Sequence, residues 1–190
     1  MTKAPVDELE KSMNSTGALR LNLGGCGEGF REGRIPGFLT VDLRDGADVQ
    51  SNVKDLSMFK DQSVTEIYSS NVLEHFPHTE TVQVLKEWKR VLIPKGKLWL
   101  SVPDFDASVR VYLKEGLVDW VKFLLWGDQL HPLNFHYINF TFASLARDCH
   151  KAGFADIKRV VSLPFGLEDA SELVDSHNGI RISLNVEVTA

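Results

Sequence analysis

The sequence predicts an α/β fold, doubly wound, in which helices cover both faces of a mostly parallel sheet. Three observations support it. Alternating apolar residues at 19–23 run into a glycine-rich turn, further short apolar segments follow, and residues 79–92 between two of them have helical spacing. Strands that alternate with helical patterns favour a parallel sheet, because each crossover returns the chain to the same edge.

Seven segments have the character of strands. The first alternates leucine with polar residues, and the last alternates aliphatic residues with polar ones, which is typical of half-buried strands. In chain order the expected strands are residues 19–23, 38–43, 49–53, 64–70, 97–102, 155–162 and 182–188.

The expected helices lie between these strands. Residues 79–92 form the clearest one, which Pro94 and Gly96 bring to an end before the next strand. Residues 104–139 are expected to hold one or two helices and a loop around His131 and Pro132. Thr141 is a suitable N-cap for a further helix, which ends at Gly153.

Length and composition indicate one domain. Of 190 residues, 1–17 read as a polar leader and 18–190 as a single domain with lid segments near 104–139 and 164–179. A net charge of −5 makes nucleic acid an unlikely partner, because phosphate binding needs clustered Lys and Arg. No apolar run is long enough to span a membrane. The two cysteines, Cys26 and Cys149, form no CxxC pair, which fits a reduced, cytoplasmic protein. The sequence does not indicate an oligomeric state.

Polar or flexible residues recur where the predicted strands end. The glycine turn follows the first strand, and Asp42 ends the second strand, 17 residues after Gly25. Asp55 and Leu56 offer a polar edge and an apolar face to a base, and Asn71 follows the fourth strand. Because ligands of α/β sheets bind beyond the carboxyl ends of strands, these residues predict a nucleotide-like site.

The spacing of the glycines separates two ligand classes. The dinucleotide fingerprint G-x-G-x-x-G fails, because Gly25 and Gly27 are followed by Phe30 where the third glycine belongs. The tighter spacing G-x-G-x-G is met by Gly25, Gly27 and Gly29. This pattern favours a ligand without a pyrophosphate.

Four segments together resemble the class I S-adenosylmethionine-dependent methyltransferases, especially the small type 11 group: LNLGGCGEG, FLTVDL, SVTEIYSSNVLEHF and LKEWKRVLIPKGKLWLSVPDF. The resemblance runs from about residue 19 to 105 and resumes weakly at FTFASLARDCHKAGF. It implies a Rossmann-like sheet of seven strands with an antiparallel last strand, and S-adenosylmethionine as cofactor.

The resemblance also implies roles for particular residues. Gly25, Cys26 and Gly27 would border the methionine part of the cofactor, and an extra glycine leaves the register open, so that Asn22, Leu23 or Gly24 shares this role. Asp42, followed by Leu43, would hold the ribose. Asp55 and Leu56 would hold the adenine, and Asn71 would close the sulfonium side.

The expected reaction is methyl transfer to a hydroxyl or amine of a small molecule, which the sequence does not identify. A base would help such an acceptor, and the candidates are Asp104, His131, His136 and, less directly, Tyr137. Glu74, His75 and His78 lie close together in the sequence, but a metal needs ligands that converge in space, and no metal is expected.

Two other functions stay open. The chain could be a non-catalytic relative that binds S-adenosylmethionine and acts as a partner or activator, because no acidic residue ends the first strand and the segment 30–37 is too short for a full helix. A nicotinamide-dependent oxidoreductase is the third alternative, which the missing glycine opposes.

Overall fold

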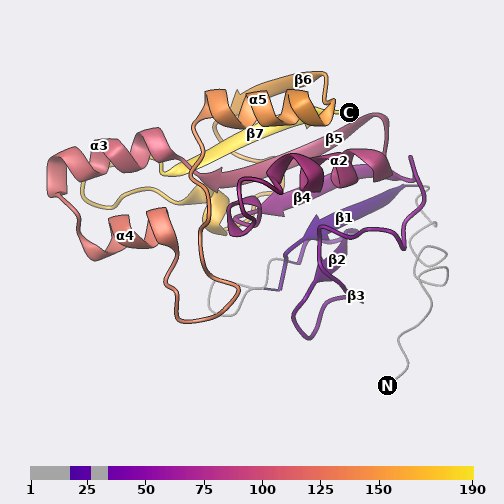
Figure 1. Cartoon of the computed structure of the whole chain (residues 1–190), viewed down its shortest axis with the longest axis horizontal. Helices are drawn as coiled ribbons and strands as arrows, with labels where there is room; N and C mark the ends of the chain where they lie inside the picture. The colour runs from indigo at the N-terminus through magenta and orange to yellow at the C-terminus, as the bar shows by residue number, and fades with distance from the viewer. Residues whose placement is uncertain (1–17, 27–33) are drawn as a thin grey trace.

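The computed structural model describes residues 18–26 and 34–190, which build a seven-stranded sheet in the order β3-β2-β1-β4-β5-β7-β6 (Figure 1). The polar leader 1–17 lies outside the described residues. The strands are β1 (Leu19–Leu23), β2 (Leu39–Asp42), β3 (Val49–Gln50), β4 (Val64–Ser70), β5 (Leu92–Pro103), β6 (Asp156–Val160) and β7 (Ser183–Thr189).

Strand direction agrees with the expectation. Each neighbouring pair from β3 through β5 is parallel, whereas β7 is antiparallel to both β5 and β6. The order reverses between β1 and β4, which are adjacent in the sheet although two strands separate them in the chain. The mostly parallel Rossmann-like sheet with an antiparallel last strand is therefore confirmed, and its switch point lies beside β1.

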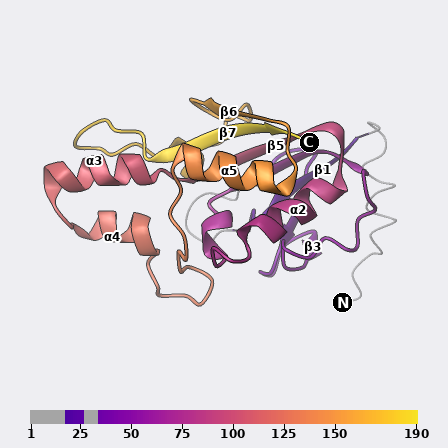
Figure 2. The ribbon, with the colours of Figure 1, turned by 45° about the horizontal axis from the view of Figure 1, so that its top comes forward.

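The longer helices lie on one face of the sheet or beyond its end. α2 (Thr81–Val91) and α5 (Phe142–Ala152) pack side by side against one face (Figure 2). α3 (Phe105–Glu115) and α4 (Asp119–Trp126) project beyond the carboxyl end of β5, as Figure 1 shows. No helix in the described residues is long and apolar enough to cross a membrane.

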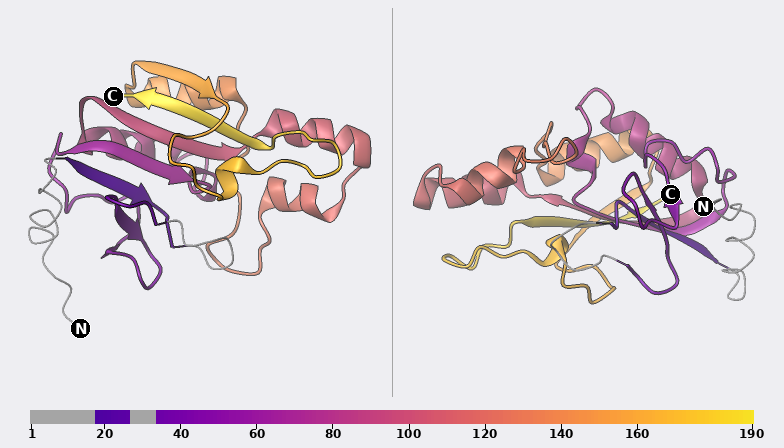
Figure 3. Two further views of the ribbon diagram at one scale, coloured as in Figure 1. Left: turned by 180° about the vertical axis from the view of Figure 1, so that it is seen from behind. Right: turned by 90° about the horizontal axis from the view of Figure 1, so that it is seen from below.

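The opposite face is covered mainly by extended chain in the described part of the protein. The segment 161–182 crosses this face and includes η2 (Ala170–Glu172) (Figure 3). Phe165 packs edge-on against Phe38, Tyr68 and Trp99, which gives this face an apolar cluster of its own. In the described residues, helices therefore cover one face of the sheet and the segment 161–182 covers part of the other.

Local signals set the helix ends. Thr141 and Ser144 form a capping box, and Gly153 ends α5 with a φ of +94°, both as the sequence predicts. The helix before β5 ends at Val91, and the strand begins at once at Leu92, with a register shift before Lys97. The loop expected near His131 follows α4.

Candidate functional site

A cleft of about 390 Å³ opens at the carboxyl ends of β1, β2 and β4. It is lined by Gly24, Asp42, Leu43, Arg44, Asn52, Val53, Lys54, Asn71, Val72, His75, Phe76, Pro77, Glu80, Pro132, Leu133 and Tyr137. A second hollow of about 210 Å³ adjoins it and shares Gly24, Arg44, Asn71, His75 and Leu133. The two therefore form one elongated site with two halves.

The first two glycines of the turn serve different purposes: Gly24 provides a backbone conformation, and Gly25 provides space beside a side chain. Gly24 has a φ of +77°, and a Cβ there would lie 2.3 Å from Cγ2 of Val72. A Cβ on Gly25 would lie 2.3 Å from the side-chain nitrogen Nδ2 of Asn22. The doubled glycine thus lets β1 turn tightly against the chain after β4. Gly27 lies outside the described residues.

Asp42 lies at the cleft edge with its carboxylate held by backbone amides. Oδ2 accepts a hydrogen bond from Cys26 N at 3.0 Å, and Oδ1 accepts one from Arg44 N at 2.9 Å. Each oxygen has a further lone pair, so the carboxylate can also accept ligand hydroxyls. Leu43 lines the cleft next to it, whereas Cys26 contributes its backbone rather than a wall.

Arg44 is a site residue that the sequence analysis does not predict. Its Nη1 donates to the carbonyl oxygen of Cys26 at 2.9 Å, and its side chain lines both halves of the site. The guanidinium joins the turn after β1 to the turn after β2. Its position two residues after Asp42, at the same strand end, is the signal that could have identified it.

Asp55 and Leu56, which the sequence analysis expects at the adenine, do not line either half of the site. Leu56 is fully buried in the core, and Asp55 is exposed and lines neither half of the site. Asn52 and Val53, directly after β3, line the cleft instead. They have the same polar-then-apolar pattern as Asp55 and Leu56.

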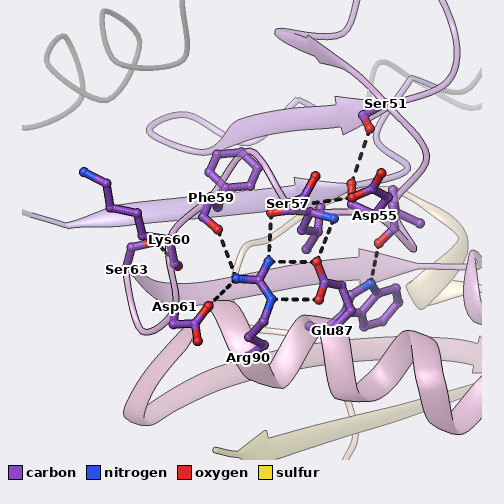
Figure 4. A network of polar contacts seen from close by, with 12 residues as sticks. Ser51, Asp55, Ser57, Phe59, Lys60, Asp61, Ser63, Glu87 and Arg90 are labelled. Atoms are coloured by element: carbon purple, nitrogen blue, oxygen red, sulfur yellow. Dashed lines mark hydrogen bonds and ion pairs between the residues drawn. The ribbon is translucent and has the colours of Figure 1, made fainter.

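A polar network fixes the position of Leu56 by anchoring the segment between β3 and β4 to α2 (Figure 4). Arg90 pairs with Glu87 and Asp61, and its guanidinium also donates to the carbonyls of Leu56 and Phe59. Glu87 in turn accepts from the backbone N–H of Leu56 at 2.9 Å. Leu56 is thereby drawn into the core and away from the cleft.

Asn71 lies between the two halves of the site. Its backbone has a φ of +52°, a left-handed conformation that asparagine tolerates, and its N–H donates to Ser101 O at 2.9 Å. The chain then enters η1 (Leu73–His75), which brings His75 to the cleft. Asn22 and Gly25 line the second half.

The structure separates the four candidate bases. Asp104 is fully buried, caps α3 through the amides of Asp106 and Ala107, and pairs with Arg159. It lines neither half of the site, so its expected place in the cleft is wrong: the residue after β5 turns inward to cap a helix. His131 is exposed and also lies outside the lining.

His136 and Tyr137 do reach the site. Tyr137 lines the first half and His136 the second, where its ring packs edge-on against His75 with centroids 4.9 Å apart. Burial lowers the pKa of His136. Burial, together with the neighbouring His136 ring, also lowers the pKa of His75, to about 4. Both imidazoles are therefore neutral near pH 7.

Comparisons with known proteins give two positive findings, a family match and a set of solved structures. A family model described as "Methyltransferase domain" matches residues 37–100. A comparison with curated proteins found no match. The matched segment contains the second, third and fourth strands, Asp42, Asn52 and Asn71, and most of β5.

Solved structures share the fold. A SAM-dependent methyltransferase from Archaeoglobus fulgidus is 15% identical with a TM-score of 0.55, covering 96% of this chain and 93% of that chain. One from Methanosarcina mazei is 17% identical with a TM-score of 0.56, covering 90% and 91%. Burkholderia thailandensis 1,6-didemethyltoxoflavin-N1-methyltransferase, solved with S-adenosylhomocysteine, is 16% identical with a TM-score of 0.53, covering 98% and 78%.

Proposed function

Because the chain has the fold of class I S-adenosylmethionine-dependent methyltransferases and a matching family segment, we propose that it methylates a small-molecule hydroxyl or amine. The cofactor, S-adenosylmethionine, would occupy the cleft beside β1 and β2. The acceptor would occupy the adjoining hollow of about 210 Å³.

One observation carries this proposal: Asp42 faces a cleft at the sheet's switch point, next to a turn in which Gly24 has a left-handed backbone. Its carboxylate is preorganised by two backbone amides and can accept both hydroxyls of a ribose. Val53 supplies an apolar wall for a purine face, and Asn52 supplies a polar edge. The assignment of these roles is our proposal.

The turn after β1 offers groups that could hold the methionine end of the cofactor. Gly24 and Gly25 let a ligand approach the backbone closely, while Arg44 offers a positive charge to a carboxylate. Asn22 and Asn71 border the same space and offer amide groups. These groups would hold a zwitterionic amino acid end.

The chemistry needs little from the protein beyond alignment and a proton acceptor. When bound, S-adenosylmethionine supplies a methyl group that its sulfonium has already activated. The protein holds the acceptor in line and excludes water. His136 is the best candidate base, because it is neutral near pH 7 and lines the acceptor half.

Calorimetry with S-adenosylhomocysteine tests the proposal. We expect one-site binding by the wild type and a loss of roughly tenfold to a hundredfold with Asp42→Ala, because a charged acceptor contributes about 1.5–3 kcal/mol. Asp45→Ala is the matched control: Asp45 lies three residues away, exposed and outside the lining, and its variant should bind like the wild type.

Other outcomes separate the alternatives. Binding without turnover across an acceptor screen would support the non-catalytic partner or activator. Titration with a nicotinamide dinucleotide should give no heat of binding. No binding of S-adenosylhomocysteine at millimolar concentration would contradict the methyltransferase proposal itself.

A further inference from the structure

Three residues with metal-binding side chains converge at the boundary of the two halves of the site. Glu74 and His75 come from η1, and His136 comes from the loop after α4, 61 residues later in the chain than His75. One ligand atom from each lies within 4.8 Å of the others. His78, which is close by in sequence, is exposed and does not belong to this cluster.

Glu74 is the most unusual member. Its side chain is 1% exposed, and neither carboxylate oxygen has a hydrogen-bond partner among the described residues. A buried carboxylate without a partner is costly, because it loses its hydration and gains nothing in return. Native proteins compensate such groups with a proton, a water or a cation.

The two histidines are oriented by carbonyl groups behind them. Nδ1 of His75 lies 3.1 Å from Phe135 O, and Nδ1 of His136 lies 2.9 Å from Leu124 O. A carbonyl oxygen can only accept, so each Nδ1 carries the proton, and Nε2 is the unprotonated nitrogen of the neutral ring. Metal-binding histidines are held in this way by an acceptor on the other nitrogen.

We propose that Glu74, His75 and His136 form a binding site for a divalent transition-metal ion, with Zn²⁺ as the best fit. Two imidazole nitrogens and one carboxylate suit Zn²⁺ and similar transition-metal ions, whereas Mg²⁺ and Ca²⁺ prefer oxygen atoms as ligands. A positive ion would also offset the negative charge that Glu74 carries when it is ionised.

The present spacing needs only a small adjustment. Ligand atoms about 2.1 Å from a tetrahedral Zn²⁺ lie roughly 3.4 Å apart. Separations of up to 4.8 Å would therefore close by about 1.5 Å or less, which side-chain rotation in η1 and the loop can supply.

The location suggests what the ion would do. His75 and His136 both line the acceptor half of the site, so the open coordination position would face the acceptor. Given the proposed methyl transfer, on which this step rests, the ion would bind an acceptor hydroxyl and lower its pKa, so that the proton is released to water. The alkoxide or phenolate oxygen would then take the methyl group as the bond between sulfur and that carbon breaks. With the ion bound, His136 would act as a ligand, and the ion would replace it as the group that activates the acceptor. It would select oxygen acceptors with a second coordinating group nearby.

Metal binding can be measured without an acceptor. Protein dialysed against EDTA and then against metal-free buffer is titrated with ZnCl₂, CoCl₂ and MgCl₂ by calorimetry, and Co²⁺ loading is followed by visible absorption. We expect one equivalent of Zn²⁺ and Co²⁺ to bind, with Co²⁺ bands typical of four ligands, and no comparable binding of Mg²⁺.

Variants locate the site. Glu74→Gln and His136→Gln should each weaken Zn²⁺ binding by roughly tenfold to a hundredfold. The controls His78→Gln and His131→Gln change exposed histidines outside the cluster and should bind Zn²⁺ like the wild type. Circular dichroism and S-adenosylhomocysteine binding check that each variant is folded.

The outcomes are distinguishable. Absence of a stoichiometric Zn²⁺ site in the wild type, or equal affinity in cluster variants and controls, would overturn the metal proposal and leave the cofactor assignment standing. Zn²⁺ binding by a protein that does not bind S-adenosylhomocysteine would support the metal site and contradict the methyltransferase proposal.

Discussion

The indole Nε1 of Trp88 donates a hydrogen bond to the carbonyl oxygen of Val53 at 2.9 Å. Trp88 is fully buried on α2, and Val53 is part of the cleft wall. A core side chain thus holds the backbone at the place where we propose that the adenine binds. Packing of α2 and the shape of the cleft are therefore coupled.

Replacement of Trp88 tests this coupling. Trp88→Phe keeps most of the packing but leaves the Val53 carbonyl without its donor, so we expect a loss of about 1–3 kcal/mol in the free energy of unfolding. S-adenosylhomocysteine should bind several-fold more weakly, because the wall is no longer anchored. Denaturant unfolding and calorimetry measure the two effects.

Trp99→Phe is the matched control. The indole nitrogen of Trp99 is also buried, but it has no hydrogen-bond partner among the described residues, and its ring packs on the opposite face near Phe165. This variant should retain cofactor affinity. Equal losses of affinity in the two variants would show that general core packing, rather than the Val53 anchor, shapes the cleft.

Glu87 should contribute stability that depends on pH. Hydrogen bonds from Arg90, and a further one from Leu56 N, hold the pKa of Glu87 below its ordinary value of 4.5. A lowered carboxyl pKa stabilises the fold above pH 4.5, and the contribution is lost as pH falls through the folded pKa. Glu87→Gln should cost about 1 kcal/mol at pH 7, and the difference should shrink in acid.

Unfolding of both proteins in urea from pH 7 down to pH 3 gives this comparison. Lys86→Gln, which changes a neighbouring charge outside the network, should not alter the profile. A difference between wild type and Glu87→Gln that stays constant with pH would contradict the role of the ionised carboxylate.

Gly24 and Gly46 differ in a way that mutations can separate. Gly24→Ala imposes both a left-handed backbone and a clash with Val72, whereas Gly46→Ala imposes the backbone cost alone, because no atom of the described chain lies within 4 Å of its Cβ position. We expect Gly46→Ala to cost roughly 1–3 kcal/mol in stability with cofactor affinity retained. Gly24→Ala should cost more and weaken S-adenosylhomocysteine binding at least tenfold.

Thermal unfolding and calorimetry on both variants check this expectation. Undiminished cofactor affinity in folded Gly24→Ala would mean that the turn after β1 does not border the ligand.

Asp104 should behave as a structural residue. Asp104→Asn keeps the acceptor oxygen that caps α3 but removes the charge that pairs with Arg159. Because the guanidinium is about half exposed, we expect a moderate loss of roughly 1–3 kcal/mol in stability. Cofactor affinity of the folded protein should be unchanged, and a selective loss of affinity without a loss of stability would return Asp104 to the site.

Local signals in the sequence were sufficient for much of the fold. Apolar alternation defines strands such as β1 and β4, and Thr141 with Gly153 defines both ends of α5, because capping and periodicity act over a few residues. Strand ends are equally local, so the sequence alone was enough to place Asp42 and Asn71 at the carboxyl edge of the parallel strands, where the cleft lies.

Only the tertiary structure decided which polar residues face that cleft. Asn52 and Asp55 follow β3 with similar patterns, and it is the pairing of Leu56 with Glu87 and Arg90, 31 and 34 residues away, that turns Asp55 outward. His136 likewise joins Glu74 through a loop that crosses from α4. The sequence by itself determined most of the helices and strands and the edge of the sheet where the cleft opens, because those depend on local propensity and patterning. The membership of the site depends on contacts between distant segments, which only the packed fold establishes.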